Sequence, residues 1–528
     1  MPAVSADGRW IAFDSRATNL VSGDTNLARD VFLRDLASGT TTRVSVSSTG
    51  LEANNESQTP AVSADARYVA FASLASNLVL NDTNNAVDVF VRDTLAGTTL
   101  RVSVDSSGAQ AFGVSVDPEI SADGRFVVFT SSAANLVSGD GNGVDDVFLR
   151  DLVSGLTTRI SVSSAGLEGN LRSGLAALSD DASRVAFSSL ASNLVANDTN
   201  VAWDVFLHEL ATGQTTRISI SSTGTQGNAD SRYPSLSADG RFVAFASFAH
   251  NLVPGDFNNM SDVFVHDALT GQTTLESISA LGVQGNDTSE FPALSDDGQT
   301  VAFMSAAANL VPGDFNDTAD IFVRQRPSGQ VALASVDSSG IQGDDLSFFP
   351  ALPADGSAVA FMSLATNLDP GDTNGTWDAF LREFQGGGVV TYCTASTTSI
   401  PLCQAAIHAT GTPSASNPTG FTVSSGPIPG KVFGLAYLGT NGAAALPLGT
   451  QGGFVCVAAP IFRAAAKQSS GTLGTCTGVI DYTLQELSAA HAPAGVPGTT
   501  VHTAIWFRDP PSPDTFALSD GLRFVVLP

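Results

Sequence analysis

The feature that most constrains the fold of this chain is a 58-residue repeat that occurs seven times without an insertion. Phe32 recurs at this step as far as Phe380, and Asp7 recurs at the same step as far as Asp355. A fixed period of this length is typical of architectures in which each repeat is one supersecondary unit. Because no copy gains or loses a residue, the loops are fixed in length as firmly as the regular elements.

One copy, Pro60 to Asp117, divides into four predicted strands, "PAVS", "RYVAFAS", "DVFVRD" and "TTLRVSV". Asp-Gly stands in the first turn of five copies and predicts a tight hairpin. The second and third strands are apolar at successive positions, which indicates that both of their faces are buried. A sheet of this kind needs a neighbour on each side.

Seven four-stranded units of this kind predict an all-β chain whose residues 1–388 form a closed seven-bladed β-propeller. An open stack of seven sheets would leave two apolar end faces uncovered. In an antiparallel blade the two tight turns fall on one face of the disc and the two long loops fall on the other. We expect function on the long-loop face.

The stretches "SADGRFVAFAS" (237–247) and "DVFVHD" (262–267) resemble the TolB-type, PD40 (WD40-like) propeller repeat. The resemblance covers residues 2 to about 388. Blades of typical TolB proteins have a short turn where this chain has the longer "NLVPGDFNNMSDVFV". The longer loop resembles a subgroup found in secreted bacterial proteins.

The charge of the chain narrows the choice of partners. The net charge of −27 falls on residues 1–388, because residues 389–528 carry five acidic and five basic side chains. Such a surface repels nucleic acid and anionic membranes and attracts cations. No apolar run approaches the roughly 20 residues of a membrane-spanning helix, so we expect neither nucleic-acid binding nor membrane insertion.

Each copy places Asp, Asn and Asp at positions one, three and seven of its first long loop. Calcium takes oxygen ligands from such alternate positions of a loop, and a divalent cation would offset the repulsion between the two carboxylates. The residues are Asp24, Asn26 and Asp30; Asp82, Asn84 and Asp88; Asp140, Asn142 and Asp146; Asp198, Asn200 and Asp204; Asp256, Asn258 and Asp262; Asp314, Asn316 and Asp320; and Asp372, Asn374 and Asp378. The pattern predicts structural Ca²⁺.

This loop is not an EF-hand, because it lacks the glycine at position six and the glutamate at position twelve. The alternative is an Asx-turn, with the last aspartate capping the start of a strand. That alternative explains one or two of the positions, and less well the whole triplet in every copy.

Four aromatic residues on the long loops differ from their counterparts in the other copies and are candidates for contact with a sugar ring or a peptide. They are Trp203, Phe257, Phe315 and Trp377. Packing against neighbouring loops is the simpler explanation of the same four residues.

No catalytic pattern is recognisable in the sequence. There is no Gly-x-Ser-x-Gly elbow, no His-Glu-x-x-His helix and no phosphate-binding loop, and the six histidines lack ligand spacing. Propellers of the prolyl-peptidase family carry a hydrolase domain, whereas only about 140 residues follow here, without its nucleophile motif. We therefore expect a protein that is not an enzyme.

Residues 389–528 change in composition and predict a small β-sandwich with turn-rich connections. All four cysteines lie here and predict two disulfides and an oxidising compartment. Cys393–Cys403 and Cys456–Cys476 are the pairs closest in sequence, and the two other pairings stay open. Stretches such as "GGFVCVAAPIFR" resemble an uncharacterised C-terminal module of secreted bacterial proteins, which implies at most an accessory or surface-association role.

The chain opens inside a repeat, since "MPAVSADGRW" aligns with "TPAVSADARY" at 59–68, so we expect a secretory segment to precede it in the natural protein. The expected function is that of a secreted or cell-surface binding protein whose propeller loops hold a protein or a glycan. One alternative is a TolB-like periplasmic scaffold, which a co-purifying partner would favour. A propeller hydrolase or lyase is the other, which blade-specific polar residues around the axis would favour.

Overall fold

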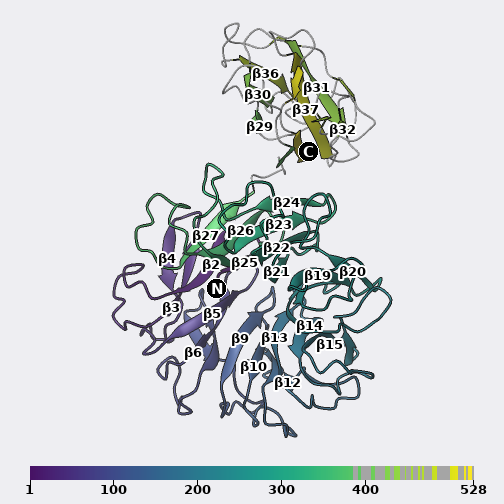
Figure 1. Cartoon of the computed structure of the whole chain (residues 1–528). Helices are drawn as coiled ribbons and strands as arrows, with labels where there is room; N and C mark the ends of the chain where they lie inside the picture. The colour runs from purple at the N-terminus through teal and green to yellow at the C-terminus, as the bar shows by residue number, and fades with distance from the viewer. Residues whose placement is uncertain are drawn as a thin grey trace. The chain divides into compact units, whose positions relative to one another are not determined.

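The computed structural model describes residues 1–384 and, beyond them, twelve short strands. The chain forms two compact units, Met1–Glu383 and Phe384–Pro528. The first unit is a ring of seven antiparallel sheets, the propeller that the repeat predicts (Figure 1). The structure contains no helix among the described residues, and so none that is long and apolar enough to cross a membrane.

Each blade begins with an innermost strand. These strands are β1 (Ala3–Val4), β5 (Ser57–Val62), β9 (Ser115–Ile120), β13 (Ser173–Leu178), β17 (Ser231–Leu236), β21 (Ser289–Leu294) and β25 (Ser347–Ala351). The second strands are β2 (Trp10–Ser15), β6 (Tyr68–Ser73), β10 (Phe126–Ser131), β14 (Arg184–Ser189), β18 (Phe242–Ser247), β22 (Thr300–Ser305) and β26 (Ala358–Ser363).

The third strands are β3 (Asp30–Asp35), β7 (Asp88–Asp93), β11 (Asp146–Asp151), β15 (Asp204–Glu209), β19 (Asp262–Asp267), β23 (Asp320–Gln325) and β27 (Asp378–Glu383). The outermost strands are β4 (Thr40–Arg43), β8 (Thr98–Arg101), β12 (Thr157–Arg159), β16 (Gln214–Arg217), β20 (Gln272–Leu275) and β24 (Gln330–Leu333). Six blades thus have four strands, and the described part of the seventh has three.

One further strand, β28 (Val390–Cys393), follows the seventh blade at the place in the repeat where an outermost strand would come. It pairs with β39 (Gly521–Val525) and not with β27. The other strands of the second unit are β29 (Ala406–Thr410), β30 (Thr422–Ile428), β31 (Phe433–Gly439), β32 (Leu446–Pro447), β33 (Phe454–Val455), β34 (Phe462–Arg463), β35 (Lys467–Gln468), β36 (Gly478–Thr483), β37 (Thr500–Arg508) and β38 (Phe516–Leu518). The disulfides predicted for Cys393–Cys403 and Cys456–Cys476 are not described, because Cys403, Cys456 and Cys476 lie outside the described residues and Cys393 is described only as the end of β28.

The core of each blade is a pair of phenylalanines that face each other across the second and third strands. Phe71 pairs with Phe90 in register, and their ring centroids lie 5.9 Å apart. The same stacked pair occurs in all seven blades. Buried residues of neighbouring blades pack together, as Val89 does with Phe129 in one cluster, so the core lies between the sheets. This two-sided burial explains the continuous apolar runs in the sequence.

A ring of backbone hydrogen bonds joins the blades near the tight-turn end of their inner strands. In each blade the N–H of one residue donates to the carbonyl oxygen of its counterpart 58 residues later. The residues of this ring are Ala6, Ala64, Ala122, Asp180, Ala238, Asp296 and Ala354. The N–H of Ala354 returns to the oxygen of Ala6, so the propeller is closed.

The tight turn that follows each inner strand has the role the sequence predicts for it. The Asp7 carboxylate accepts hydrogen bonds from the Ser5 hydroxyl at 2.6 Å and from the Arg9 N–H at 3.0 Å. These bonds fix the turn, and Gly8 adopts a φ of 70° there, a conformation that favours glycine.

Candidate functional site

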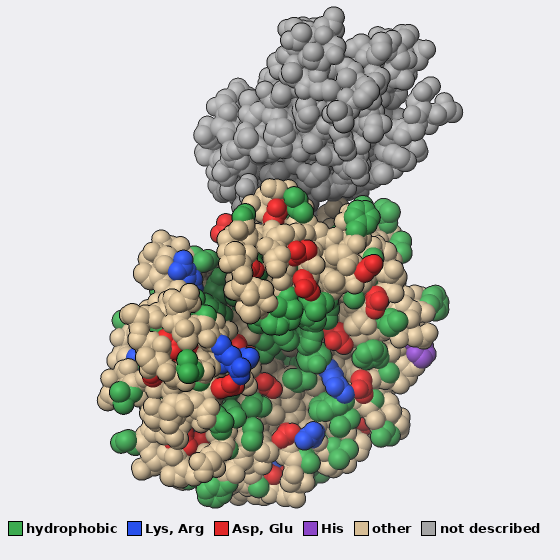
Figure 2. Space-filling view, turned by 60° about the vertical axis from the view of Figure 1, so that its left-hand side comes forward, with side chains coloured by type: hydrophobic (Ala, Val, Ile, Leu, Met, Phe, Trp, Pro, Cys, Tyr) green, Lys and Arg blue, Asp and Glu red, His purple; other side chains and the backbone are tan. Residues whose placement is uncertain are grey.

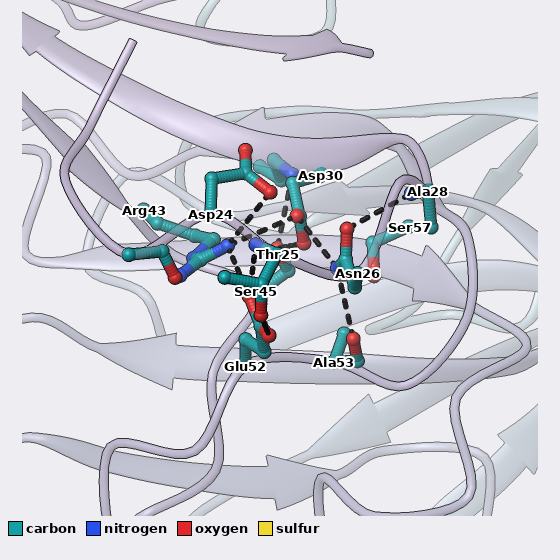
Figure 3. Close-up of polar contacts among 12 residues, drawn as sticks. Asp24, Thr25, Asn26, Ala28, Asp30, Arg43, Ser45, Glu52, Ala53 and Ser57 are labelled. Carbon is teal, nitrogen blue, oxygen red and sulfur yellow. Dashed lines mark hydrogen bonds and ion pairs between the residues drawn. The ribbon is translucent and has the colours of Figure 1, made fainter. Parts of the chain in front are cut away.

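The repeated Asp-x-Asn-x-x-x-Asp loop forms a compact hydrogen-bonded unit in each blade. Figure 3 shows the loop of the first blade. In the first blade Asn26 Nδ2 donates to Asp30 Oδ2 at 2.8 Å and to the carbonyl oxygen of Ala53 at 2.9 Å. Its Oδ1 accepts the N–H of Ala28 at 2.9 Å. Asn26 therefore fixes the loop with both ends of its amide, as an Asx-turn residue does.

The last aspartate of the triplet is buried beneath this loop. Asp30 has no exposed surface, and its Oδ1 accepts a hydrogen bond from the hydroxyl of Ser45, two residues beyond the outermost strand. The asparagine-to-aspartate bond recurs in all seven blades. The serine recurs in the six blades whose outer strand is described: Ser45, Ser103, Ser161, Ser219, Ser277 and Ser335.

An arginine that the sequence analysis did not single out lies between the two carboxylates in blades one to four. Nη1 of Arg43 is 3.3 Å from Asp24 Oδ1, 3.3 Å from Asp30 Oδ2 and 2.9 Å from Glu52 Oε2 (Figure 3). Its counterparts are Arg101, Arg159 and Arg217. The recurrence of this arginine at 58-residue steps was the signal available in the sequence. In blades one to four an arginine of the chain itself therefore balances the charge of the two loop aspartates, as a bound cation would.

Blades five and six lack this cation, because Leu275 and Leu333 stand at the arginine position. Here Gln284 Nε2 donates to Asp256 Oδ1 and to Asp262 Oδ2, each at 2.8 Å. Gln342 does the same for Asp314 and Asp320. Burial raises the pKa of Asp262 to about 6, and it raises the pKa of Asp320 to the same value. The neutral glutamine amide donates hydrogen bonds to the aspartate oxygens but does not balance their negative charge.

Blade three brings three carboxylates closest to the arrangement of a cation site. One oxygen each from Asp140, Asp146 and Glu168 lie within 4.8 Å of one another. Asp140 Oδ1 is buried without a hydrogen-bond partner, and burial together with the Asp146 charge raises the pKa of Asp140 to about 6. Arg159 Nη1 lies 2.6 Å from Glu168 and 3.8 Å from Asp140. The oxygen set suits Ca²⁺, but a guanidinium already occupies part of the space.

The four predicted long-loop aromatics separate into two pairs. Phe257 and Phe315 are 82% and 84% exposed at the loops of blades five and six. Trp203 lies under the Arg232 guanidinium, whose central carbon is 4.9 Å from the ring centroid, and Trp377 meets Phe348 edge-on at 5.7 Å. Trp203 therefore contacts the inner strand of the next blade, and Trp377 contacts the inner strand of its own blade. Phe257 and Phe315 are open to a partner.

A channel of about 630 Å³ runs along the axis of the propeller. Figure 2 shows a hollow in this unit lined by hydrophobic side chains with charged side chains around it. All seven innermost strands contribute to the lining. Its volume lies within the range of ligand pockets.

One residue in each of six inner strands has a left-handed backbone at a shift of strand register. These residues are Thr59, Asp117, Leu175, Tyr233, Phe291 and Phe349, with φ between 49° and 56°. A bulge of this kind redirects a side chain, and all six line the channel. The residue varies from blade to blade, so the seven repeats build an asymmetric channel.

Aromatic residues form a continuous arc on one side of this channel. Tyr233 packs on Phe291 with ring centroids 4.5 Å apart, and Phe291 packs on Phe349 at 4.8 Å. Phe348 and Trp377 extend the arc within the seventh blade. Sequence reasoning missed this arc, because the varied residues precede a proline in five inner strands and read as turn positions.

The opposite side of the channel carries two carboxylates from the third blade, Asp117 and Glu119. Desolvation by the surrounding channel wall raises the pKa of both groups, and the Asp117 charge adds to a pKa of about 7 for Glu119, although the Glu119 side chain itself is open to the solvent of the channel. No described residue donates a hydrogen bond to either carboxylate. The carboxylates are thus available to a ligand.

No family model matches the sequence, and no curated protein matches it either. Solved structures do match by fold. TolB from Acinetobacter baumannii is 17% identical with a TM-score of 0.36, over 62% of this chain and 66% of that one, just under two thirds of its length. A protein assigned as TolB from Agrobacterium tumefaciens is 16% identical with a TM-score of 0.37, over 66% of this chain and 96% of that one.

An oligogalacturonate lyase in complex with manganese is 14% identical with a TM-score of 0.44, over 72% of this chain and 87% of that one. At these identities and TM-scores the likeness carries no conclusion about this chain. The fold itself follows from the seven closed sheets of this chain.

Proposed function

We propose that this protein is a non-catalytic binding or scaffold protein that acts outside the cytoplasm and holds a protein or glycan at its axial channel. The observation that carries the proposal is the asymmetry of the channel lining. The outer parts of the blades repeat closely, whereas the channel joins an aromatic arc in blades five to seven to two carboxylates in blade three. Rings that border a cavity with a few polar groups are typical of a ligand site.

The test is a binding screen of the purified protein against a glycan microarray and a peptide library, repeated with channel variants. Phe291→Ala and Phe349→Ala remove the centre of the arc, and we expect each to weaken binding at least tenfold. Phe257→Ala and Phe315→Ala are matched controls, because these rings are exposed and do not line the channel. If the control variants lost binding while the channel variants retained it, the binding site would lie on the long loops and not in the channel.

Location outside the cytoplasm is supported by the resemblance of the repeat to secreted and periplasmic propellers. A secreted or cell-surface protein is our first choice, and a periplasmic scaffold is the alternative. Fractionation of the source cells with an antibody against the propeller distinguishes these places.

We also propose that calcium stabilises the repeated loops where their carboxylates lack a full counter-charge. The converging oxygens of Asp140, Asp146 and Glu168 support this, as do blades five and six, where leucine stands at the arginine position. Thermal unfolding of metal-free protein, titrated with calcium and then with magnesium, is the test. A rise in melting temperature specific to calcium is expected, and no shift would leave the triplets as hydrogen-bonded turns.

A hydrolase or lyase is the second candidate, because polar residues specific to one blade lie at the axis. Glu119, with a pKa of about 7, is suited to donate or accept a proton, and the pKa of Tyr233 is raised mainly by burial, with smaller contributions from the Glu290 and Asp117 charges. Turnover of any bound glycan or peptide that is lost in Glu119→Gln would establish this activity in place of simple binding.

A further inference from the structure

A second, smaller pocket of about 270 Å³ lies on the boundary between blades three and four. It shares Asp117 and Leu175 with the axial channel, so the two spaces adjoin. Trp203, Val116 and Thr130 form other parts of its wall. A ligand in the channel can therefore extend one group into this side pocket.

The side pocket is associated with a departure from the repeat at Gly174. The five other described blades with a full inner strand have larger residues at this position: Gln58, Val116, Arg232, Glu290 and Phe348. The backbone of Gly174 does not require glycine, because its φ is not positive. A Cβ there would lie 3.2 Å from both Thr130 Cγ2 and Thr130 Oγ1, which is tighter than an ordinary contact, so Thr130 packs directly on the glycine and a longer side chain would have to displace it or enter the pocket.

The wall of the side pocket combines an aromatic ring, aliphatic side chains and a carboxylate. Asp117 accepts no hydrogen bond from any described residue, and Thr130 Oγ1 is buried without a partner. At the same pocket Arg172 Nε lies 3.1 Å from Asp145 Oδ2, so these two charges balance each other. The charge left without a partner is that of Asp117.

We infer that the side pocket binds a lysine or arginine side chain of a peptide segment whose remaining residues lie in the axial channel. This inference rests on the proposed binding function. The aliphatic stem of such a side chain would lie along Val116 and Leu175, and its cationic head would meet the Asp117 carboxylate. Trp203 would add a cation–π contact of the kind that Arg232 already makes with it.

A peptide fits this space better than an oligosaccharide does. The channel is lined mainly by alanine, proline, valine, leucine and aromatic residues, so most hydroxyl groups of a sugar would lose water without gaining a partner. The net charge of −27 on residues 1–388 also favours a basic partner.

The first probe is N-acetyl-arginine amide, compared with its neutral isostere N-acetyl-citrulline amide by NMR titration at millimolar concentration. We expect the arginine probe to bind at least tenfold more tightly. Asp117→Asn should abolish this preference, and Gly174→Val should weaken binding of the arginine probe at least tenfold by filling the pocket. Gly174→Val combined with Thr130→Ala relieves the close contact and keeps the test valid if the single variant unfolds.

Equal binding of the two probes, or unchanged preference in Asp117→Asn, would overturn the inference. Tighter binding of a glucosamine tetramer than of tetra-arginine would also overturn it, because the occupant would then be an amino sugar. The proposed function is decided separately by Phe291→Ala and Phe349→Ala, whose effect on the screened ligands does not depend on the side pocket.

Discussion

The backbone N–H of Ala354 donates a hydrogen bond to the carbonyl oxygen of Ala6, and the two atoms lie 3.0 Å apart. These residues are 348 positions apart in the sequence, at the two ends of the repeat array. The bond is the seventh of a series in which every blade donates to the next. An open stack of sheets would have six such bonds and two free ends.

Closure of the ring predicts that the hydrogen bond between Ala354 and Ala6 contributes as much to stability as a hydrogen bond between two internal blades. Ala354→Pro and Ala64→Pro each remove one donor, and Ala64 donates at 3.0 Å to Ala122. We expect both variants to lose about 1 to 3 kcal/mol of unfolding free energy, the cost of an unsatisfied backbone group. Chemical denaturation followed by circular dichroism measures this, and a markedly smaller loss in Ala354→Pro would indicate an open ring.

The arginine between the loop carboxylates predicts a large loss of stability when it is removed. Arg159 is 9% exposed in its side chain and faces Asp140, Asp146 and Glu168. Arg159→Leu should lower the unfolding free energy by about 3 kcal/mol, because it leaves buried carboxylates unpaired. Arg16→Leu is the control, since Arg16 pairs with Glu56 at the surface and should cost less than about 1 kcal/mol. Similar losses in both would contradict the assignment.

The sequence predicted the parts of this structure that repeat. A residue that recurs at the same place in seven copies can be recognised as a structural requirement, whereas a single occurrence could be due to chance. Strand order, the tight turn at Asp7 and the burial of Phe71 all follow from period and apolar pattern. The axial channel did not follow, since it is built from residues such as Asp117 and Tyr233 that differ between copies. Their convergence depends on ring closure and on a bulge in each inner strand, neither of which is a local sequence property.

The buried aspartates predict that the protein is most stable in mildly acidic solution. Asp140, Asp262 and Asp320 have a pKa of about 6 in the folded protein, whereas an unfolded aspartate titrates near 3.9. Between these values the three aspartates bind more protons in the folded chain, so their contribution to stability falls as the pH rises from about 4 to 7. Burial lowers the pKa of His208 and of His266, and these two groups oppose the trend below about pH 6.5. Asp35, Asp93 and Asp267 have a lowered pKa beside arginines, so stability also falls below about pH 4.

We therefore expect the melting temperature to reach its maximum between about pH 4 and 6. Calorimetry in a series of buffers without metal checks this, and Asp262→Asn together with Asp320→Asn should flatten the decline toward pH 7. A melting temperature that rises steadily from pH 5 to 7.5 would contradict the expectation. If calcium binds the loops, it should reduce the decline, because the metal binds the ionised carboxylates.

Two exposed residues in the long loops have a strained backbone that suggests a role in contact with a partner. Leu27 and Val201 have φ of 57° and 55°, although the same position is Asn85 or Asn259 in other blades, and asparagine tolerates this conformation. Val201 is 88% exposed and Leu27 is 82% exposed, so their replacement removes almost no packing. Val201→Asn should therefore raise the unfolding free energy by about 1 kcal/mol.

The reverse change, Asn85→Val, is the matched control and should lower the unfolding free energy by a similar amount. Chemical denaturation of both variants beside the natural protein measures the two effects. An unchanged or lowered stability in Val201→Asn would show that the loop carries no strain at this residue. A gain in stability that is accompanied by weaker partner binding would mean that the apolar side chain is retained for contact, at the expense of the fold.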